Sequence, residues 1–338
     1  MMDFARSYSA RWRVYKVNRK TWADAELVSD IDAISISRNA GGDLIESGSM
    51  DVTGSFDNDY YRIAMVAEQG GEVERIDLAT MLFQSKDGEH DYGTTKQSVD
   101  GNSVLYPAST TTVLIGGYAP AGVDGAAYAG KLLADSINAP VKVEGHFTLD
   151  TNIVHELGSY VIDAVWDVLN AGNFCIQIDG RGVVHIRPMP KEPILTIDNS
   201  NAKLLTNGIK FSNAESELPN RYIVIVGDSK TIAVNSDPNS RISTVSRGYY
   251  VDMVDNSPAP INGETIAAYA NRKLRESSIL KDERSYTREY AKDVNVNSIV
   301  RASINGLEGD LRVISQSFKC EHGIVVEEKA NREIKLWQ

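Results

Sequence analysis

The chain has few cysteines and no long apolar run. Among its 338 residues only Cys175 and Cys320 are cysteines, which excludes the dense disulfide framework typical of small secreted domains. No run of 18 apolar residues occurs, which excludes a transmembrane helix. The first residues also lack the apolar core of a signal peptide. We therefore expect a protein that is made and folded in a cytoplasm.

Each of the two cysteines lies in a hydrophobic strand pattern. Free cysteines are among the most buried side chains, so we predict two buried, reduced thiols. Sequence spacing does not determine whether the two cysteines are bonded to each other. A disulfide between Cys175 and Cys320 is therefore also consistent with the sequence.

Positive charge is scarce relative to negative charge. Lys and Arg total 35 and Asp and Glu total 46, which gives a net charge of −11. A protein that grips a phosphate backbone needs a basic patch, so the balance argues against a nucleic-acid-binding surface. An acidic surface suits a channel through which DNA slides without sticking, and it also simply keeps many proteins soluble.

Catalytic signatures are missing as well. The sequence contains no G-x-S-x-G elbow, no G-x-x-x-x-G-K-[ST] phosphate loop and no G-x-G-x-x-G dinucleotide signature. The nearest approach to a metalloprotease motif is His155-Glu156, but the second histidine of that motif is replaced by Ser159. The sequence therefore predicts no enzyme, with no catalytic, cofactor-binding or metal site.

Paired carboxylates are harder to dismiss. A glycosidase needs only two of them across a cleft, and their spacing in the sequence is not constrained. Among 46 acidic residues, Glu144 and Asp150 are arbitrary candidates for such a pair. A cell-wall hydrolase, either glycosidase or peptidase, is therefore the alternative from the enzyme class.

The first 118 residues read mainly as short strands. Met50–Thr53 and Tyr60–Ala67 have strand character, the first with strict period-2 alternation. Glycines at 70 and 71 and the run Lys86-Asp-Gly88 indicate turns. This pattern predicts a small antiparallel barrel or sandwich as the first domain.

Residues 119–190 have a different pattern. We predict one helix at 124–137, capped by Asp124, and a second at 157–169 with apolar residues on one face. Asp179-Gly180 between two alternating segments predicts a β-hairpin. The segment is thus an α/β insert with helices and a hairpin.

Residues 191–338 are again rich in strands. Arg221–Gly227 and Arg312–Cys320 are the clearest of them, and residues 262–280 form a predicted helix. We expect a second domain here, although residues 191–227 could instead complete the first domain across the insert.

The order of these segments resembles the tail-hub proteins of long-tailed phages and related injection machines. The loose patterns that carry the resemblance are Ile34–Arg38 with Ile45–Val52, Tyr118–Gly122 with Tyr128–Leu133, Leu157–Pro188, Asn220–Gly227, Ser243–Gly248, Asp293–Val300 and Ile314–Phe318. The resemblance implies a mainly β, α+β fold with two tail-tube-type β-barrel domains and an intervening α/β insert.

The resemblance also implies a non-enzymatic structural protein of the virion tail, assembled in the host cytoplasm. Such hubs are homotrimers that close the tail tube, adapt its sixfold symmetry to a threefold tip and line the DNA channel. The implied partners are the tail tube or distal tail ring, the tape measure protein and tip spike or fibre proteins, with DNA passing without specific binding. A hexameric tail-tube or distal-tail ring is the other structural alternative, and it would be shorter and lack the insert.

Overall fold

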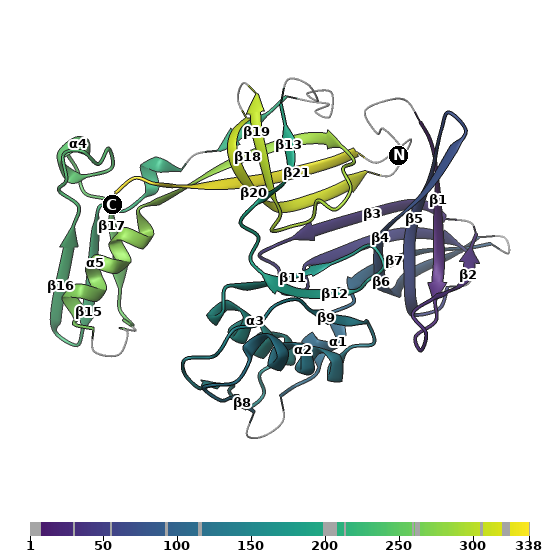
Figure 1. Ribbon diagram of the computed structural model, residues 1–338, viewed down its shortest axis with the longest axis horizontal. Helices are drawn as coiled ribbons and strands as arrows, with labels where there is room; N and C mark the ends of the chain where they lie inside the picture. The colour runs from purple at the N-terminus through teal and green to yellow at the C-terminus, as the bar shows by residue number, and fades with distance from the viewer. Residues whose placement is uncertain are drawn as a thin grey trace. The chain divides into compact units, whose positions relative to one another are not determined.

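The computed structural model describes residues 8–29, 31–54, 56–91, 94–113, 117–198, 208–212, 214–258, 260, 264–304, 307–319 and 325–337. The chain divides into two compact units (Figure 1). The larger unit contains Met1–Ile209 and Tyr286–Lys329, and the smaller unit contains Lys210–Ser285 and Ala330–Gln338. One division lies between Ile209 and Lys210, and the other two fall within the long strands β18 (Ile279–Glu289) and β21 (Val325–Lys335).

Seven antiparallel strands begin the larger unit, and they pair in the order β3-β4-β7-β6-β5-β1-β2. Most of their buried apolar side chains form one core, which includes Ile63, Met81 and Phe83. The tight turn between β5 and β6 is made by Gly70 and Gly71, which both have positive φ. The strands are β1 (Ser9–Val17), β2 (Asp24–Val28), β3 (Ile31–Asn39), β4 (Glu46–Thr53), β5 (Asp59–Gln69), β6 (Glu72–Asp91) and β7 (Thr94–Ser103).

Strand β20 (Leu307–Lys319) connects this sheet to a second group of strands. Its later part, from Ser315 to Lys319, pairs with β3. Its earlier part, from Leu307 to Arg312, pairs with β19 (Ile299–Ile304), which in turn pairs with β13 (Pro193–Ile197). Among the described residues, no strand pairing closes this order into a barrel.

The rest of the larger unit is an α/β segment. A three-stranded sheet, β9 (Val141–Val143), β12 (Val184–Pro188) and β11 (Phe174–Ile178), lies beside the helices, as Figure 1 shows. Leu133, Val165 and Ile176 are among the buried residues of its core. The remaining elements are α1 (Tyr106–Thr110), β8 (Tyr118–Ala119), α2 (Gly125–Ser136), β10 (Ile153–Val154) and α3 (Val161–Ala171).

The smaller unit is a three-stranded sheet with one helix. The strands follow the order β16 (Ser229–Val234), β15 (Arg221–Val226), β17 (Asp252–Asp255), and α5 (Ile266–Ser277) packs on one face. Thr265 caps α5 by accepting a hydrogen bond from the Ala268 amide at 3.2 Å. The unit also contains β14 (Lys210–Ser212), a 3-10 turn at Glu215–Glu217 and the short helix α4 (Thr244–Arg247).

The mainly β, α+β fold class is confirmed, and three local predictions need correction. The helix predicted at 262–280 spans only Ile266–Ser277, because Thr265 caps its start and Ile279 already belongs to β18. The helix predicted from residue 157 begins only at Val161, because Gly158 has φ +90° in a turn that precedes it. The chain also does not turn at Lys86–Gly88. Strand β6 continues through these residues with a shift of register between Ser85 and Asp87, so the glycine accompanies a bulge.

Candidate functional site

The predicted hairpin of the insert is present, and its turn contacts the sheet of β5 and β6. Asp179 shapes the turn, since its Oδ1 accepts hydrogen bonds from the amides of Arg181 and Val183, both at 2.9 Å. The carbonyl oxygen of Gly180 accepts a hydrogen bond from Thr80 on β6 at 3.0 Å. The carbonyl oxygen of Arg181 accepts another from the indole nitrogen of Trp22 at 2.7 Å.

Glycine is required in this turn because the backbones approach so closely. A β-carbon at position 180 would lie 1.7 Å from the carbonyl oxygen of Asp77, and real contacts of that kind are essentially never below 3.0 Å. Gly182 has φ +74°, and a β-carbon there would lie 2.7 Å from Cβ of Thr80. The turn is therefore fitted to the sheet, which makes it a rigid joint between the insert and the strands.

A fully buried arginine completes this joint. The Arg62 guanidinium donates to Thr80 Oγ1 at 3.1 Å, to the Trp22 carbonyl oxygen at 3.1 Å and to the Arg181 carbonyl oxygen at 3.2 Å. It also pairs with the Asp24 carboxylate. Burial lowers the pKa of Arg62, and the Asp24 charge opposes this. The guanidinium charge of Arg62 is thus balanced by a carboxylate, and its N–H groups are hydrogen-bonded on several sides. Such an arrangement is typical of a structural arginine.

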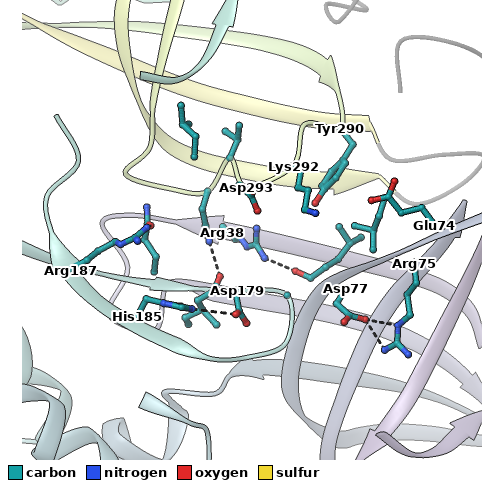
Figure 2. Close-up of a pocket in the computed structure, with 18 residues that line it drawn as sticks. Arg38, Glu74, Arg75, Asp77, Asp179, His185, Arg187, Tyr290, Lys292 and Asp293 are labelled. Carbon is teal, nitrogen blue, oxygen red and sulfur yellow. Dashed lines mark hydrogen bonds and ion pairs between the residues drawn. The ribbon is translucent and has the colours of Figure 1, made fainter. Parts of the chain in front are cut away.

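A polar cavity of about 420 Å³ lies beside the joint (Figure 2). Its lining comes from β3, the start of β6, the β11–β12 hairpin, β13 and the loop at 290–295, all in the larger unit. The loop is held to the hairpin by the Asn295 side chain, which donates to the Ile178 carbonyl oxygen at 2.7 Å. The charged and aromatic lining residues are Arg38, Glu74, Arg75, Asp77, Asp179, His185, Arg187, Tyr290, Lys292 and Asp293.

His185 lies between two carboxylates at one side of this cavity. Its Nδ1 is 2.6 Å from Glu144 Oε1, and its Nε2 is 3.3 Å from Asp179 Oδ2. Arg187 also donates from Nε to Glu144 Oε2 at 2.9 Å. Burial raises the pKa of Glu144, but the hydrogen bonds from His185 and Arg187 outweigh it, so the pKa is lowered.

The two carboxylate candidates from the sequence do not form a hydrolytic pair here. An acid catalyst needs a raised pKa, whereas hydrogen bonds from His185 and Arg187 lower the pKa of Glu144. Asp150 is exposed and does not line the cavity. No serine, threonine or cysteine lines the cavity as a nucleophile that could transfer its proton to His185. The two arbitrary carboxylate candidates are therefore not brought together in this cavity.

The structure also bears on the metal, membrane and cysteine predictions. No group of three His, Cys, Asp or Glu side chains suited to a metal ion occurs in the described part of the chain. Nor does any helix there have both the length and the apolar character of a membrane span. Cys175 is a buried free thiol, whereas Cys320 lies outside the described residues.

His155 is buried, with 8% of its surface exposed, and neither ring nitrogen has a hydrogen-bond partner. Burial lowers its pKa, and the Asp167 carboxylate on α3 acts in the opposite direction. From the sequence, His155 was considered only as a metal ligand, because no sequence pattern indicates a buried histidine without hydrogen-bond partners. The contact between the hairpin turn and the sheet was not predicted either, although the two glycines that flank Arg181 indicate a close approach of backbones.

No protein-family model matches the chain, and no curated protein matches it in sequence. Solved structures do match. The 43 kDa tail protein of prophage MuSo2 from Shewanella oneidensis superimposes with a TM-score of 0.63 at 13% identity, covering 95% of this chain and 98% of that one. The tail protein from Neisseria meningitidis MC58 gives a TM-score of 0.63 at 12% identity, with 97% of each chain covered.

The chain has the fold of these phage-type tail proteins. The likeness extends over nearly the full length of both partners, so it includes the insert and the smaller unit as well as the strands. At 12 to 13% identity it is a likeness of fold. The resemblance drawn from the order of strands and turns is confirmed at that level.

Proposed function

We propose that this protein is a structural hub of a phage-type tail baseplate. In this role it closes the tail tube and adapts the sixfold tube to a threefold tip. The observation that carries the proposal is the fold shared, over nearly the whole chain, with two proteins described as tail proteins. Function resides in sites and surfaces more than in folds, so the proposal needs a direct test of assembly.

The proposal includes two tube-type barrel domains separated by the α/β insert. Residues 1–118 would form the first, with residues 191–227 as a candidate completion, and residues 191–338 the second. Three chains would then supply six such domains, which matches a sixfold tube. Open sheet edges support this idea, because strands of neighbouring copies could cover edges that otherwise invite aggregation.

The net charge of −11 supports a channel through which DNA passes without specific binding. In the proposed assembly the hub would contact the tail tube or distal tail ring on one side. The tape measure protein and the spike or fibre proteins of the tip would be its other partners. The rigid joint between hairpin and sheet would let the insert transmit force to the strands without changing their relative positions.

The mass of the purified protein in solution, measured by light scattering over a concentration series, tests this proposal. A mass near three chains is the expected result. A mass near six would favour the hexameric tail-tube or distal-tail ring, although that alternative should lack an α/β insert. A monomer that also fails to bind tail components would contradict the hub.

The hydrolase alternative has its own measurement. Release of soluble fragments from purified peptidoglycan, abolished by a single carboxylate substitution, would favour it. We expect no release, because Glu144 is engaged by His185 and Arg187 and is therefore a poor proton donor.

A further inference from the structure

One face of the smaller unit's sheet is apolar and open to solvent. Tyr222, Val224 and Ala233 point toward α5 and are buried in one cluster with it. Side chains alternate along a strand, so their neighbours point to the opposite face. Ile223 lies directly between Ile232 on β16 and Val254 on β17, which places an apolar row across all three strands.

We call this outer face the sheet patch. Its apolar members are Ile223, Ile225, Ile232, Val234, Tyr250 and Val254. Exposed fractions are 36% for Ile225, 45% for Ile232, 38% for Val234, 52% for Val254 and 57% for Tyr250. These values correspond to on the order of 400 Å² of open apolar surface, a size that marks interaction sites and is about half of what one partner buries in a standard interface.

The polar rim of the sheet patch gives information about its partner. Arg221 binds Asp252 through two hydrogen bonds of 2.6 Å, and its guanidinium lies over the Tyr250 ring at 3.9 Å from the centroid. Lys230, opposite Ile225, is exposed. An apolar centre with a rim of mostly paired charges is typical of a protein interface and unlike a surface for nucleic acid.

A second exposed apolar surface lies on the insert. We call it the insert patch, and its members are Tyr118, Val154, Leu157 and Tyr160. Val154 is 74% exposed and lies opposite Tyr118, which is 50% exposed, in the β8–β10 pair. Leu157 is 77% exposed on a turn closed by the hydrogen bond from the Ser159 amide to the Glu156 carbonyl oxygen at 3.1 Å. The patch therefore presents projecting side chains, whereas the sheet patch is flat.

An exposed charge of opposite sign lies beside each patch. Glu156 is exposed beside the insert patch, and Lys230 is exposed at the rim of the sheet patch. In a trimer, each contact must join two different surfaces, because contact between identical surfaces produces twofold pairs. The sheet patch of one copy therefore requires a different surface of the next copy.

We propose that the sheet patch is covered by the insert patch of a second copy of this chain, with Lys230 of one copy near Glu156 of the other. This inference rests on the proposed trimeric hub and names one contact between its copies. Leu157 and Val154 pack against the row formed by Ile223, Ile232 and Val254, and the charged pair lies at the edge. The contact repeats around the ring, so every copy uses both patches.

Single substitutions, with mass measured by light scattering over a concentration series, test this contact. Ile232→Lys and Leu157→Lys each place a charge in the buried centre, so each should raise the concentration for half-assembly at least about tenfold. Val73→Lys is the matched control, because Val73 is 65% exposed and lies outside both patches. It should assemble like the unmodified protein, and circular dichroism should show that all variants are folded.

A charge exchange makes the test specific to the named pair. Lys230→Glu and Glu156→Lys should each weaken assembly by about two- to fivefold, since each puts like charges together at the rim. The double variant restores opposite charges across the contact and should regain most of the loss.

The outcomes separate this contact from the hub itself. An unmodified trimer whose assembly is unaffected by Ile232→Lys would overturn the contact and leave the hub proposal intact. Dissociation by Ile232→Lys but not by Leu157→Lys, or no recovery in the double variant, would overturn the pairing of these two patches. A monomer at every concentration that also fails to bind tail components would overturn both.

Discussion

The backbone of Gly180 approaches Asp77 so closely that a β-carbon at position 180 would lie 1.7 Å from the Asp77 carbonyl oxygen. The turn and the strand that meet here are about a hundred residues apart in the chain, as the hydrogen bond from Thr80 to the Gly180 carbonyl oxygen also shows. The absence of a side chain thus sets how closely the insert can lie on the sheet. Such a joint would keep the insert and the sheet in fixed positions.

Gly180→Ala should destabilise the larger unit by about 3 kcal/mol or more, because the added methyl group meets backbone that cannot rotate away. The free energy of unfolding in urea measures this. Gly41→Ala is the matched control, since its nearest contact would be a side-chain oxygen of Asn39 at 3.6 Å, and it should cost less than about 1 kcal/mol. Equal losses for the two variants would contradict the close-contact explanation.

The Asp179-Gly180 hairpin could be predicted from sequence because its signal is local. Turn chemistry and strand alternation lie within fifteen residues, and the structure has the predicted strands on both sides. The residues against which the turn packs are distant from it in the sequence. Thr80 and Trp22 are ordinary strand and turn residues in the sequence, and only the fold brings them to the hairpin.

Helix boundaries and turns were less predictable for a related reason. Leu157 fits the apolar face of the next helix, but Gly158 has positive φ and Leu157 points into solvent instead. Lys86-Asp-Gly88 has turn composition, yet pairing of β6 with β7 on both sides of it favours a bulge. In both places long-range pairing or packing overrides a local preference. The candidate surfaces for assembly have no sequence motif, because exposure becomes visible only in the fold.

Glu328 is the centre of a buried network in the larger unit, and its removal should be costly. Arg288 donates to Glu328 Oε2 at 2.6 Å and 3.1 Å, and Gln316 donates to the same oxygen at 2.9 Å. The Arg288 side chain is 1% exposed and that of Glu328 is fully buried. Glu328→Ala leaves an unpaired buried charge, so unfolding in urea should show a loss of about 3–5 kcal/mol.

An exposed ion pair provides the comparison for Glu328. Arg301 and Asp310 pair at 2.7 Å, but their side chains are 51% and 46% exposed. Asp310→Ala should therefore cost less than about 1 kcal/mol. Replacing Arg288 and Glu328 together by Met and Leu should recover most of the loss, because no unpaired charge is left. Failure of that recovery would show that packing, and not charge, dominates at this place.

Cys175 should be unreactive in the folded protein. Burial raises the pKa of its thiol to about 11, so very little thiolate exists at pH 8 and reagents cannot reach it. In a Cys320→Ser variant, where it is the only thiol, 5,5′-dithiobis(2-nitrobenzoate) should react about a hundredfold or more slowly than in urea. Rapid reaction without denaturant would contradict the buried position.

Stability should fall in mild acid because of His155. An unfolded histidine has a pKa near 6.5, and burial lowers the pKa of His155 in the folded protein despite the opposing Asp167 charge. Between the lowered pKa and about 6.5, the unfolded chain binds more protons than the folded chain. The stabilising difference is therefore complete above about pH 7.5 and is lost as pH falls through 6.5 toward the folded pKa.

The His155→Phe variant removes this titration while keeping a ring in the space. Its free energy of unfolding relative to the unmodified protein should rise as pH falls from 8 to 5.5, by about 1.4 kcal/mol for each pH unit between the two pKa values. His146 is exposed, so His146→Gln should show no such trend. A constant difference between His155→Phe and the unmodified protein over this range would mean that the folded protein accepts the imidazolium, which its burial without any hydrogen-bond partner argues against.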